Sequence, residues 1–152
     1  MKTKLSVLFF CLCSLISFSA CNSGNKQKQS TQLETLPTPV RDFLSQKYPA
    51  ATVLKIEKEQ NGTEVDIQEK NIHKEIRFDT GNQWVSTHWN IKSDDVPVAI
   101  MEALASSAYN QYKIEDITLI ERPSGTFYRF ELKQENNEVD LVFDSKAQVA
   151  VQ

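Results

Sequence analysis

Hydrophobic and polar residues alternate along most of the chain beyond residue 50, which is the pattern of strands that bury one side. The first four strands are expected at Thr52–Gln60, Thr63–Glu69, Ile72–Asp79 and Gln83–Asn90. Asn61-Gly62 separates the first two and is a strong signal for a tight hairpin, and Thr80-Gly81-Asn82 separates the last two. The pattern therefore predicts two consecutive antiparallel hairpins.

Two stretches repeat their apolar residues every three or four positions instead, as helices do. Before the first hairpin, Thr38 is expected to cap a helix that has Pro39 at its first position and ends at Pro49. Its apolar stripe is Val40, Phe43, Leu44 and Tyr48. A second helix is expected after the capping pair Asp94-Asp95. Its stripe is Val96, Ile100, Ala103, Leu104 and Ala108.

The second helix is followed by another set of alternating segments. These strands are expected at Glu115–Arg122, Thr126–Gln134, Glu138–Asp144 and Ala147–Val151. The two halves align element by element, with Gly62 on Gly125 and Phe78-Asp79 on Phe143-Asp144. The chain therefore reads as two helix-plus-four-strand repeats, at about 36–92 and 93–152.

The N-terminus has the form of an export signal. Lys2 and Lys4 precede the apolar run Leu5–Ile16, which is too short to span a membrane. The run leads to Phe18-Ser19-Ala20-Cys21, which resembles the lipobox of bacterial lipoproteins. Residues 1–20 are thus expected to be a lipoprotein signal peptide, with Cys21 lipidated. The alternative is an ordinary secretory signal cut after Ala20, which would leave Cys21 as a free thiol.

Cysteine positions and composition narrow the possibilities further. All three cysteines lie at or before Cys21, so the mature chain has no pair to form a disulfide. Residues 21–35 are expected to be a lipidated cysteine and a flexible tether, because Asn22–Thr35 is almost without apolar residues. The whole chain has 40% hydrophobic residues and a net charge of -3, a balance typical of a globular protein and not of a nucleic-acid-binding one. One domain is expected, at 36–152.

Lys74–Trp84 and its echo Glu138–Lys146 resemble the repeat of the PepSY-like, beta-lactamase-inhibitor-like family of exported bacterial proteins. The start of the second helix, Val96–Ile100, is similar to that family too. The resemblance implies an α+β fold in which two repeats form one antiparallel sheet of about eight strands. It implies helices on one face of that sheet and an open opposite face.

Alternation assigns the strand residues to the two faces. The helix-facing set, expected to form the core, is Val65, Ile67, Ile76, Phe78, Tyr128, Phe130, Leu132, Val139, Leu141 and Phe143. The candidate binding face is formed by Glu64, Asp66, Glu75, Arg77, His88, Phe127, Arg129, Glu131 and Asp140. This face is either a recognition surface with Phe127 and Arg129 as anchors or a solvated face with weakly paired charges.

Trp84 and His88 are expected to share one face of their strand, with Trp89 on the other face. One indole is therefore expected in the core, and the other is expected to mark either a contact site or the junction of the repeats. No histidine or cysteine cluster has the spacing of a metal site, and no cofactor is expected. The chain carries no nucleophile elbow, phosphate loop or activated cysteine. An enzyme is therefore the least supported class.

The sequence favours a non-enzymatic envelope lipoprotein that recognises a protein or peptide through the open sheet face. One alternative is an inhibitor of an exported hydrolase, either a beta-lactamase or a protease. Another is a structural or sensor domain with a solvated sheet. The expected location is the cell envelope, anchored by lipid and facing the periplasm, and the expected partners are an envelope protein or peptide and the membrane.

Overall fold

The structure, a computed structural model, describes residues 33–150, and the predictions for the signal peptide and Cys21 lie outside this range. Its elements run in the order α2 (Thr38–Lys47), β1 (Thr52–Glu59), β2 (Gly62–Glu69), β3 (Ile72–Asp79), β4 (Trp84–Asn90), η1 (Ser93–Asp95), α3 (Val98–Ala105), β5 (Lys113–Arg122), β6 (Gly125–Gln134) and β7 (Asn137–Asp144). The predicted α+β fold with a single antiparallel sheet is confirmed.

The sheet has seven strands, and each strand pairs with the next along the chain, from β1 to β7. An eighth strand was expected at Ala147–Val151. The described part of that segment contributes one isolated bridge, between Phe143 and Val149. The turn after β7 extends to Gln148, whose backbone N–H donates to the Asp144 carboxylate. Of the described residues, this leaves Val149 and Ala150 to run beside β7.

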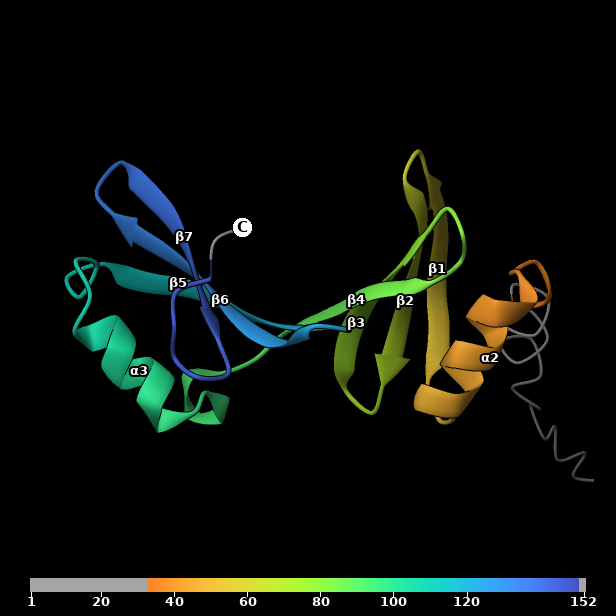
Figure 1. Cartoon of the computed structure of the whole chain (residues 1–152), viewed down its shortest axis with the longest axis horizontal. Coiled ribbons are helices and arrows are strands. Elements are labelled where there is room, and N and C mark those ends of the chain that lie inside the picture. The colour runs from red at the N-terminus through yellow and green to blue at the C-terminus, as the bar shows by residue number, and fades with distance from the viewer. Residues whose placement is uncertain (1–32, 151–152) are drawn as a thin grey trace, which may run out of the picture.

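Both helices cover the same face of the sheet. The register carries Val65 of β2 across to Ile76 of β3 and Thr87 of β4. From Thr87 the same face continues through β5 to β6 and β7, where it presents Tyr128 and Phe143. The first two residues pack with α2 and the last two with α3. The opposite face carries neither described helix, and we call it the open face (Figure 1).

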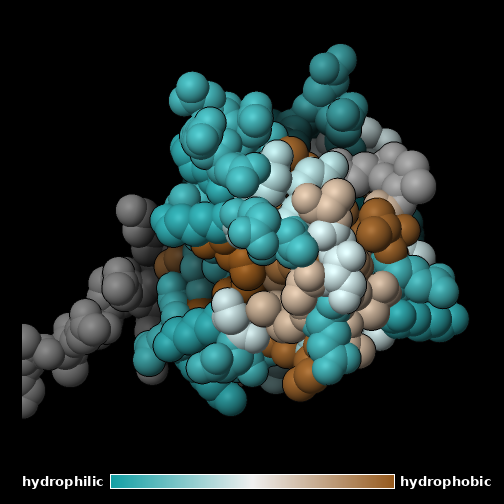
Figure 2. Space-filling model, turned by 90° about the vertical axis from the view of Figure 1, so that its left-hand side faces the viewer, coloured by the Kyte–Doolittle hydropathy of each residue, from teal (hydrophilic) through white to brown (hydrophobic). Residues whose placement is uncertain are grey.

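The core consists of two clusters, one beneath each helix. Val40 and Leu44 of α2 pack on β2 and β3, whereas Ile100 and Leu104 of α3 pack on β5 to β7. Of the ten predicted core residues nine are buried, and Val139 is half-buried. The end of the molecule that carries α3 shows apolar surface framed by hydrophilic side chains (Figure 2).

The two clusters are bridged by β4, which divides its length between two partners. Its residues Trp84 to His88 pair with β3, and Thr87 to Asn90 pair with β5. Only Thr87 and His88 have partners on both sides. The sheet therefore narrows at this strand, between the two halves seen in Figure 1.

The helices begin slightly away from the predicted caps. Pro37 occupies the N-cap of α2, so Thr38 is already helical, and its hydroxyl accepts a hydrogen bond from Arg41 at 3.1 Å. Asp94 and Asp95 lie in the short turn η1, and Pro97 precedes α3. Proline fixes φ near the helical value, and here it replaces the side-chain cap that the sequence suggested. No helix within residues 33–150 is both long and apolar enough to cross a membrane.

The turns after β3 and β7 share a side-chain hydrogen bond to the backbone. Asp79 accepts from the backbone of Gln83 at 2.8 Å, and Asp144 accepts from that of Gln148 at 2.9 Å. Asn82 and Ala147 adopt nearly equal positive φ angles, 63° and 61°. In each turn the aspartate side chain stabilises this strained backbone.

Candidate functional site

The open face brings together the residues that the alternation assigned to it. Strand pairing places Glu64 opposite Arg77, and Asp66 opposite Glu75, which is in turn opposite His88. Across β5, the same face continues to Phe127 and Arg129 of β6. The nine candidate residues on this face are Glu64, Asp66, Glu75, Arg77, His88, Phe127, Arg129, Glu131 and Asp140.

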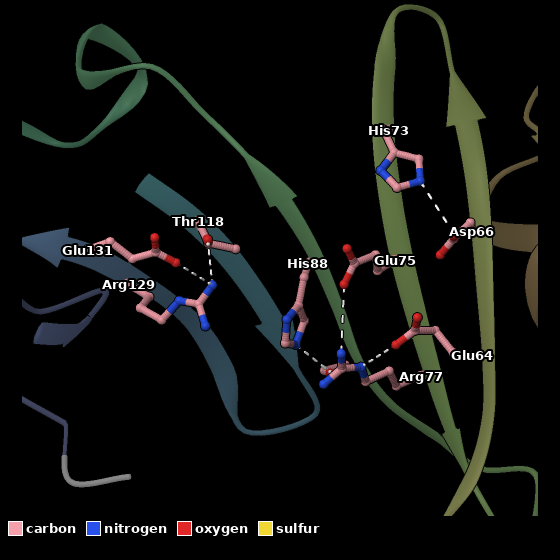
Figure 3. A network of polar contacts seen from close by, with 10 residues as sticks. Glu64, Asp66, His73, Glu75, Arg77, His88, Thr118, Arg129 and Glu131 are labelled. Atoms are coloured by element: carbon pink, nitrogen blue, oxygen red, sulfur yellow. Dashed lines mark hydrogen bonds and ion pairs between the residues drawn. The ribbon is translucent and has the colours of Figure 1, made fainter. Parts of the chain in front are cut away.

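His88 lies at the centre of the open face, on the strand where the two halves of the sheet meet (Figure 3). Its Nε2 atom is 2.9 Å from the hydroxyl of Ser86 on the same face. Burial, followed by the nearby charges of Arg77, Arg122 and Arg129, lowers the pKa of His88 from 6.5 to about 4. The imidazole is therefore neutral at neutral pH.

Ion pairs occupy the β2–β3 side of the open face. The Nε atom of Arg77 donates to Glu64 at 2.7 Å, and its Nη2 atom lies 3.7 Å from Glu75. The hydrogen bond to Glu64 raises the pKa of Arg77 above its ordinary value. His73 lies 3.7 Å from Asp66. Arg77 thus has two carboxylate neighbours on its own side of the face (Figure 3).

The cations on the β5–β6 side are paired less completely. The Nη2 atom of Arg129 donates to Thr118 at 3.1 Å and lies 3.4 Å from Glu131, which is half exposed. Arg122 lies over the ring of Phe127, 5.4 Å from its centroid, and forms no ion pair with a residue in the range 33–150. Positive charge therefore predominates next to His88 on this side.

Two buried side-chain polar atoms of the described residues have no hydrogen-bond partner there, and both belong to the open face. One is Oδ1 of Asp66 on β2, and the other is Nε of Arg129 on β6. An unpaired buried polar atom costs about 1–3 kcal/mol, so such atoms are rare in folded proteins and call for an explanation. They mark positions where the face lacks complementary groups.

A pocket of about 360 Å³ opens beside His88. Because β3 pairs with β4 no further than Glu75, the start of β3 separates from the end of β4 and leaves this space. The lining residues are Asn71, Ile72, His73, Glu75, His88, Trp89, Asn90, Thr118 and Arg129. Most of them are polar, so the pocket suits a charged or hydrogen-bonding group.

A second hollow, of about 330 Å³, lies at the other side of the sheet, between α2 and β1. It is mainly apolar and includes Leu44, Val53 and Ile67, which belong to the core beneath α2. This hollow contributes nothing to the open face.

The tryptophan prediction was wrong in one respect. Trp84 and His88 do not share a face, since an irregularity between Arg77 and Phe78 shifts the register of β4. Trp84 stacks on Phe43 of α2 with ring centroids 5.4 Å apart, while Trp89 lies on the same helix-covered face, within 4.7 Å of the Lys74 ammonium. Both indoles therefore lie on the side of the helices, and His88 alone faces the open side.

Several contributors to the site were missed by the sequence analysis. Ser86 and Asn90 lie two positions before and after His88 on β4, whereas Thr118 and Arg122 come near His88 only because β4 also pairs with β5. Nothing in the alternation of β4 indicates that pairing. In contrast, Asp140 is exposed opposite Glu131, away from the network around His88, and Val142 on the same face is buried.

No group of three or more histidine, cysteine, aspartate and glutamate side chains within the described range could hold a metal ion. His73 and His88, the only histidines of the chain, have their described polar contacts with Asp66 and Ser86 respectively. The site is thus a surface of paired charges with one neutral imidazole at its centre.

Solved structures with this fold come from Bacteroides species. A BLIP-like protein from Bacteroides fragilis NCTC 9343 is 28% identical, with a TM-score of 0.68 over 76% of this chain and 85% of that one. A DUF2874 family protein from Bacteroides uniformis ATCC 8492 is 21% identical, with a TM-score of 0.67 over 75% and 86%. A candidate periplasmic protein from Bacteroides eggerthii DSM 20697 is 20% identical, with a TM-score of 0.65 over 74% and 84%. The last two similarities show only that the fold is shared.

No curated protein matches the chain. The comparisons indicate no enzyme family. The family described as beta-lactamase-inhibitor-like and PepSY-like matches residues 23–73 and again 69–150. These ranges span most of the sequence, and the chain therefore belongs to the PepSY-like, beta-lactamase-inhibitor-like family.

Proposed function

We propose that the protein is a non-enzymatic binding module that recognises a protein or peptide through the open sheet face. The observation that carries the proposal is the pair of buried, unpartnered polar atoms on that face, Asp66 Oδ1 and Arg129 Nε. A partner that offers a hydrogen-bond donor to Asp66 on one side of His88 and an acceptor to Arg129 on the other would complement both halves of the face. Phe127 beneath Arg122 supplies an aromatic anchor of the kind common in interfaces.

A crosslinking pull-down from native membranes tests this proposal, because it needs no prior guess about the target. The test variant replaces Arg77, Phe127 and Arg129 together with alanine. The matched control replaces Lys58, Val98 and Lys146 together with alanine. Like the test set, these are two cations and one apolar residue, but they are exposed away from the open face. Loss of captured partners in the test variant alone supports the open face, whereas unchanged capture contradicts it.

A second candidate function is inhibition of an exported hydrolase. It is favoured by the description of the family and by the likeness to a BLIP-like protein. The short turn at Asn61-Gly62 offers little length for insertion into an enzyme cleft, so such an inhibitor would act through the sheet face. Assays of beta-lactamases and periplasmic proteases with micromolar protein decide the question, and unchanged hydrolysis rates reject this function.

The proposed location is the bacterial cell envelope, with the domain anchored through lipid on Cys21. The support is the lipobox-like sequence before Cys21 and the likeness to a candidate periplasmic protein from Bacteroides eggerthii. Growth of expressing cells with labelled palmitate provides a test. Label in the wild-type protein but not in Cys21→Ser is expected, and equal labelling of the two contradicts lipidation at Cys21.

The domain is further proposed to be a structural repeat of one helix followed by a strand meander. Support comes from the hydrogen bond that the turns at Asp79 and Asp144 share, and from Lys70 and Glu135, which both have φ of 55°. Equivalent turns should make similar contributions to stability. Asp79→Ala and Asp144→Ala are thus expected to lower the melting temperature by similar amounts, and a clear inequality would count against equivalent repeats.

A further inference from the structure

The pocket beside His88 lies between two parts of the open face that differ in charge, and its lining includes Glu75 from one part and Arg129 from the other. Across β2 and β3 the face carries Glu64, Asp66 and Glu75, with Arg77 bound by Glu64 and close to Glu75. Across β5 and β6 it carries Arg122 and Arg129, one on each side of the row formed by His88, Ile120 and Phe127. The pocket lies at the boundary, with Arg129 forming its cationic wall.

Arg129 is held by weak restraints. Its side chain is 32% exposed, and its described partners are the neutral hydroxyl of Thr118 and the carboxylate of Glu131 at 3.4 Å. Its Nε atom is covered and unpartnered. A guanidinium normally uses Nε and one Nη atom together to bind a carboxylate with two parallel hydrogen bonds. In this structure Arg129 makes no such paired contact with the described residues, which leaves that capacity unused.

We propose that this pocket receives the carboxylate of an aspartate or glutamate side chain from the partner polypeptide, with Arg129 as the binding residue. The proposal rests on the proposed function and specifies the chemistry of the partner at one point of the face. Rotation of the guanidinium away from Glu131 exposes Nε and presents its two-donor edge to the pocket. Thr118 and Asn90 line the same pocket and offer neutral hydrogen bonds to the second carboxylate oxygen.

Binding of an anion here changes the protonation of His88. The groups that face its ring are Glu64, Glu75, Arg77, Arg122 and Arg129, and the three cations disfavour the imidazolium. A bound carboxylate offsets part of this positive charge and raises the pKa of His88. By linkage, the carboxylate binds more tightly to the protonated form, so affinity rises as the pH falls through the pKa of His88 in the complex towards its value of about 4 in the free protein.

Titration with N-acetylglutamate α-amide, which bears one side-chain carboxylate, tests the pocket by NMR. The His88 ring and Arg129 Nε–H signals are expected to shift with a dissociation constant of about 1 mM, the scale of a small polar fragment. N-acetylglutamine amide has the same shape without the charge and should produce neither shift. Inorganic phosphate, run in parallel, shows whether the pocket selects carboxylate over another anion, and tighter binding of phosphate contradicts the proposal.

Substitutions distinguish a specific contribution of Arg129 from a general effect of positive charge. Arg129→Gln is expected to weaken the probe at least about tenfold, and Arg129→Lys, which keeps the charge but not the two-donor edge, should give a smaller loss. Lys133→Gln is the matched control, because Lys133 lies on the same strand and is paired with Glu138 outside the pocket. Equal affinity of the wild type and a folded Arg129→Gln or Arg129→Lys variant overturns the proposal.

The pull-down distinguishes this proposal from the broader one. If the triple variant loses its partners while Arg129→Gln retains them, the open face stands and the carboxylate pocket is rejected. If the probe binds as expected but the triple variant keeps every partner, the pocket stands as a carboxylate site and the open face is rejected as the docking surface. Loss of capture in both variants, together with competition by the probe, supports both.

Discussion

The ammonium nitrogen of Lys47, in the last turn of α2, lies 2.6 Å from a carboxylate oxygen of Glu121 on β5. This ion pair joins the helix of the first half to a strand of the second, 74 residues away. Lys47 also lies over the indole of Trp84, 4.3 Å from the ring centroid. The contact therefore spans β4 on the helix-covered face, where the sheet is narrowest.

A double-mutant cycle measures how strongly this pair couples the halves. Lys47→Met, Glu121→Gln and the double variant should give a coupling of about 0.5 kcal/mol in urea unfolding, because both side chains are about one-third exposed and solvent screens them. A Lys133/Glu138 cycle serves as the control for an exposed pair within one hairpin. Coupling well above 1 kcal/mol would show that the cross-sheet pair is more than a screened surface contact.

Gly62 begins β2 and Gly125 begins β6, with φ angles of 148° and 136°, but the two glycines differ in what surrounds them. A methyl group at Gly62 would overlap the carbonyl oxygen of Phe78, whereas one at Gly125 has nothing within 4 Å. Gly125→Ala is expected to cost about 1–3 kcal/mol from backbone strain, and Gly62→Ala more than that. Thermal unfolding of the two variants gives the comparison, and equal melting temperatures would contradict the predicted clash.

Thr87 is fully buried and accepts hydrogen bonds from the hydroxyl of Tyr48 at 3.2 Å and from the indole of Trp84 at 3.0 Å. Thr87→Val keeps the shape but leaves both donors unsatisfied, so it should lower the free energy of unfolding by about 1–3 kcal/mol. Tyr48→Phe removes one donor and should cost less. In the double variant the two losses should not add, and full additivity in chemical denaturation would refute the shared acceptor.

His88 gives the stability a dependence on acid pH. Its pKa in the folded protein, about 4, is below the unfolded value near 6.5, so between these values the unfolded chain binds more protons. Stability is therefore complete above about pH 6.5 and falls as the pH decreases towards 4. After discounting for the half-exposed ring, the contribution is about 1 kcal/mol. His88→Gln should flatten this part of the melting temperature profile, and an unchanged profile would contradict the shift.

Strand positions were predictable because each strand buries one side. The bounds of β3, Ile72–Asp79, coincide with the prediction, and those of β2 and β6 differ by one residue at the start. Alternation reports directly which side chains meet the helices, so the core was also predicted. The helix starts were less well predicted, because Pro37 and Pro97 set the backbone where polar caps were expected at Thr38 and Asp94-Asp95.

Features that depend on how strands meet were not predictable from alternation. The shift in register near Phe78 moved Trp84 to the helix-covered face, and no local residue pattern signals it. The last strand, at Ala147–Val151, was predicted only from the alternation of polar and apolar residues. The Asp144 carboxylate accepts hydrogen bonds from the backbone N–H groups of Lys146 and Gln148, which extends the turn and reduces the described part of that strand to a single bridge.

The nine candidate residues lie on one face of the sheet, where alternation placed them, whereas the pocket within that face was not predicted. The pocket depends on β4 changing partners at Thr87 and His88, so that the start of β3 separates from the end of β4. The contribution of Arg122 depends equally on the pairing of β4 with β5. Both are properties of the assembled sheet.

The division of β4 between two neighbours also has a mechanical consequence. On either side of Thr87 and His88 the chain is held by one ladder only, so bending there strains few hydrogen bonds compared with bending within a hairpin. The sheet should therefore bend most easily along the line through Thr87 and His88, which passes directly beneath the His88 imidazole. A flat or a rounded target would meet the same residues at different spacings, and adjusting to either requires the distortion of a single strand.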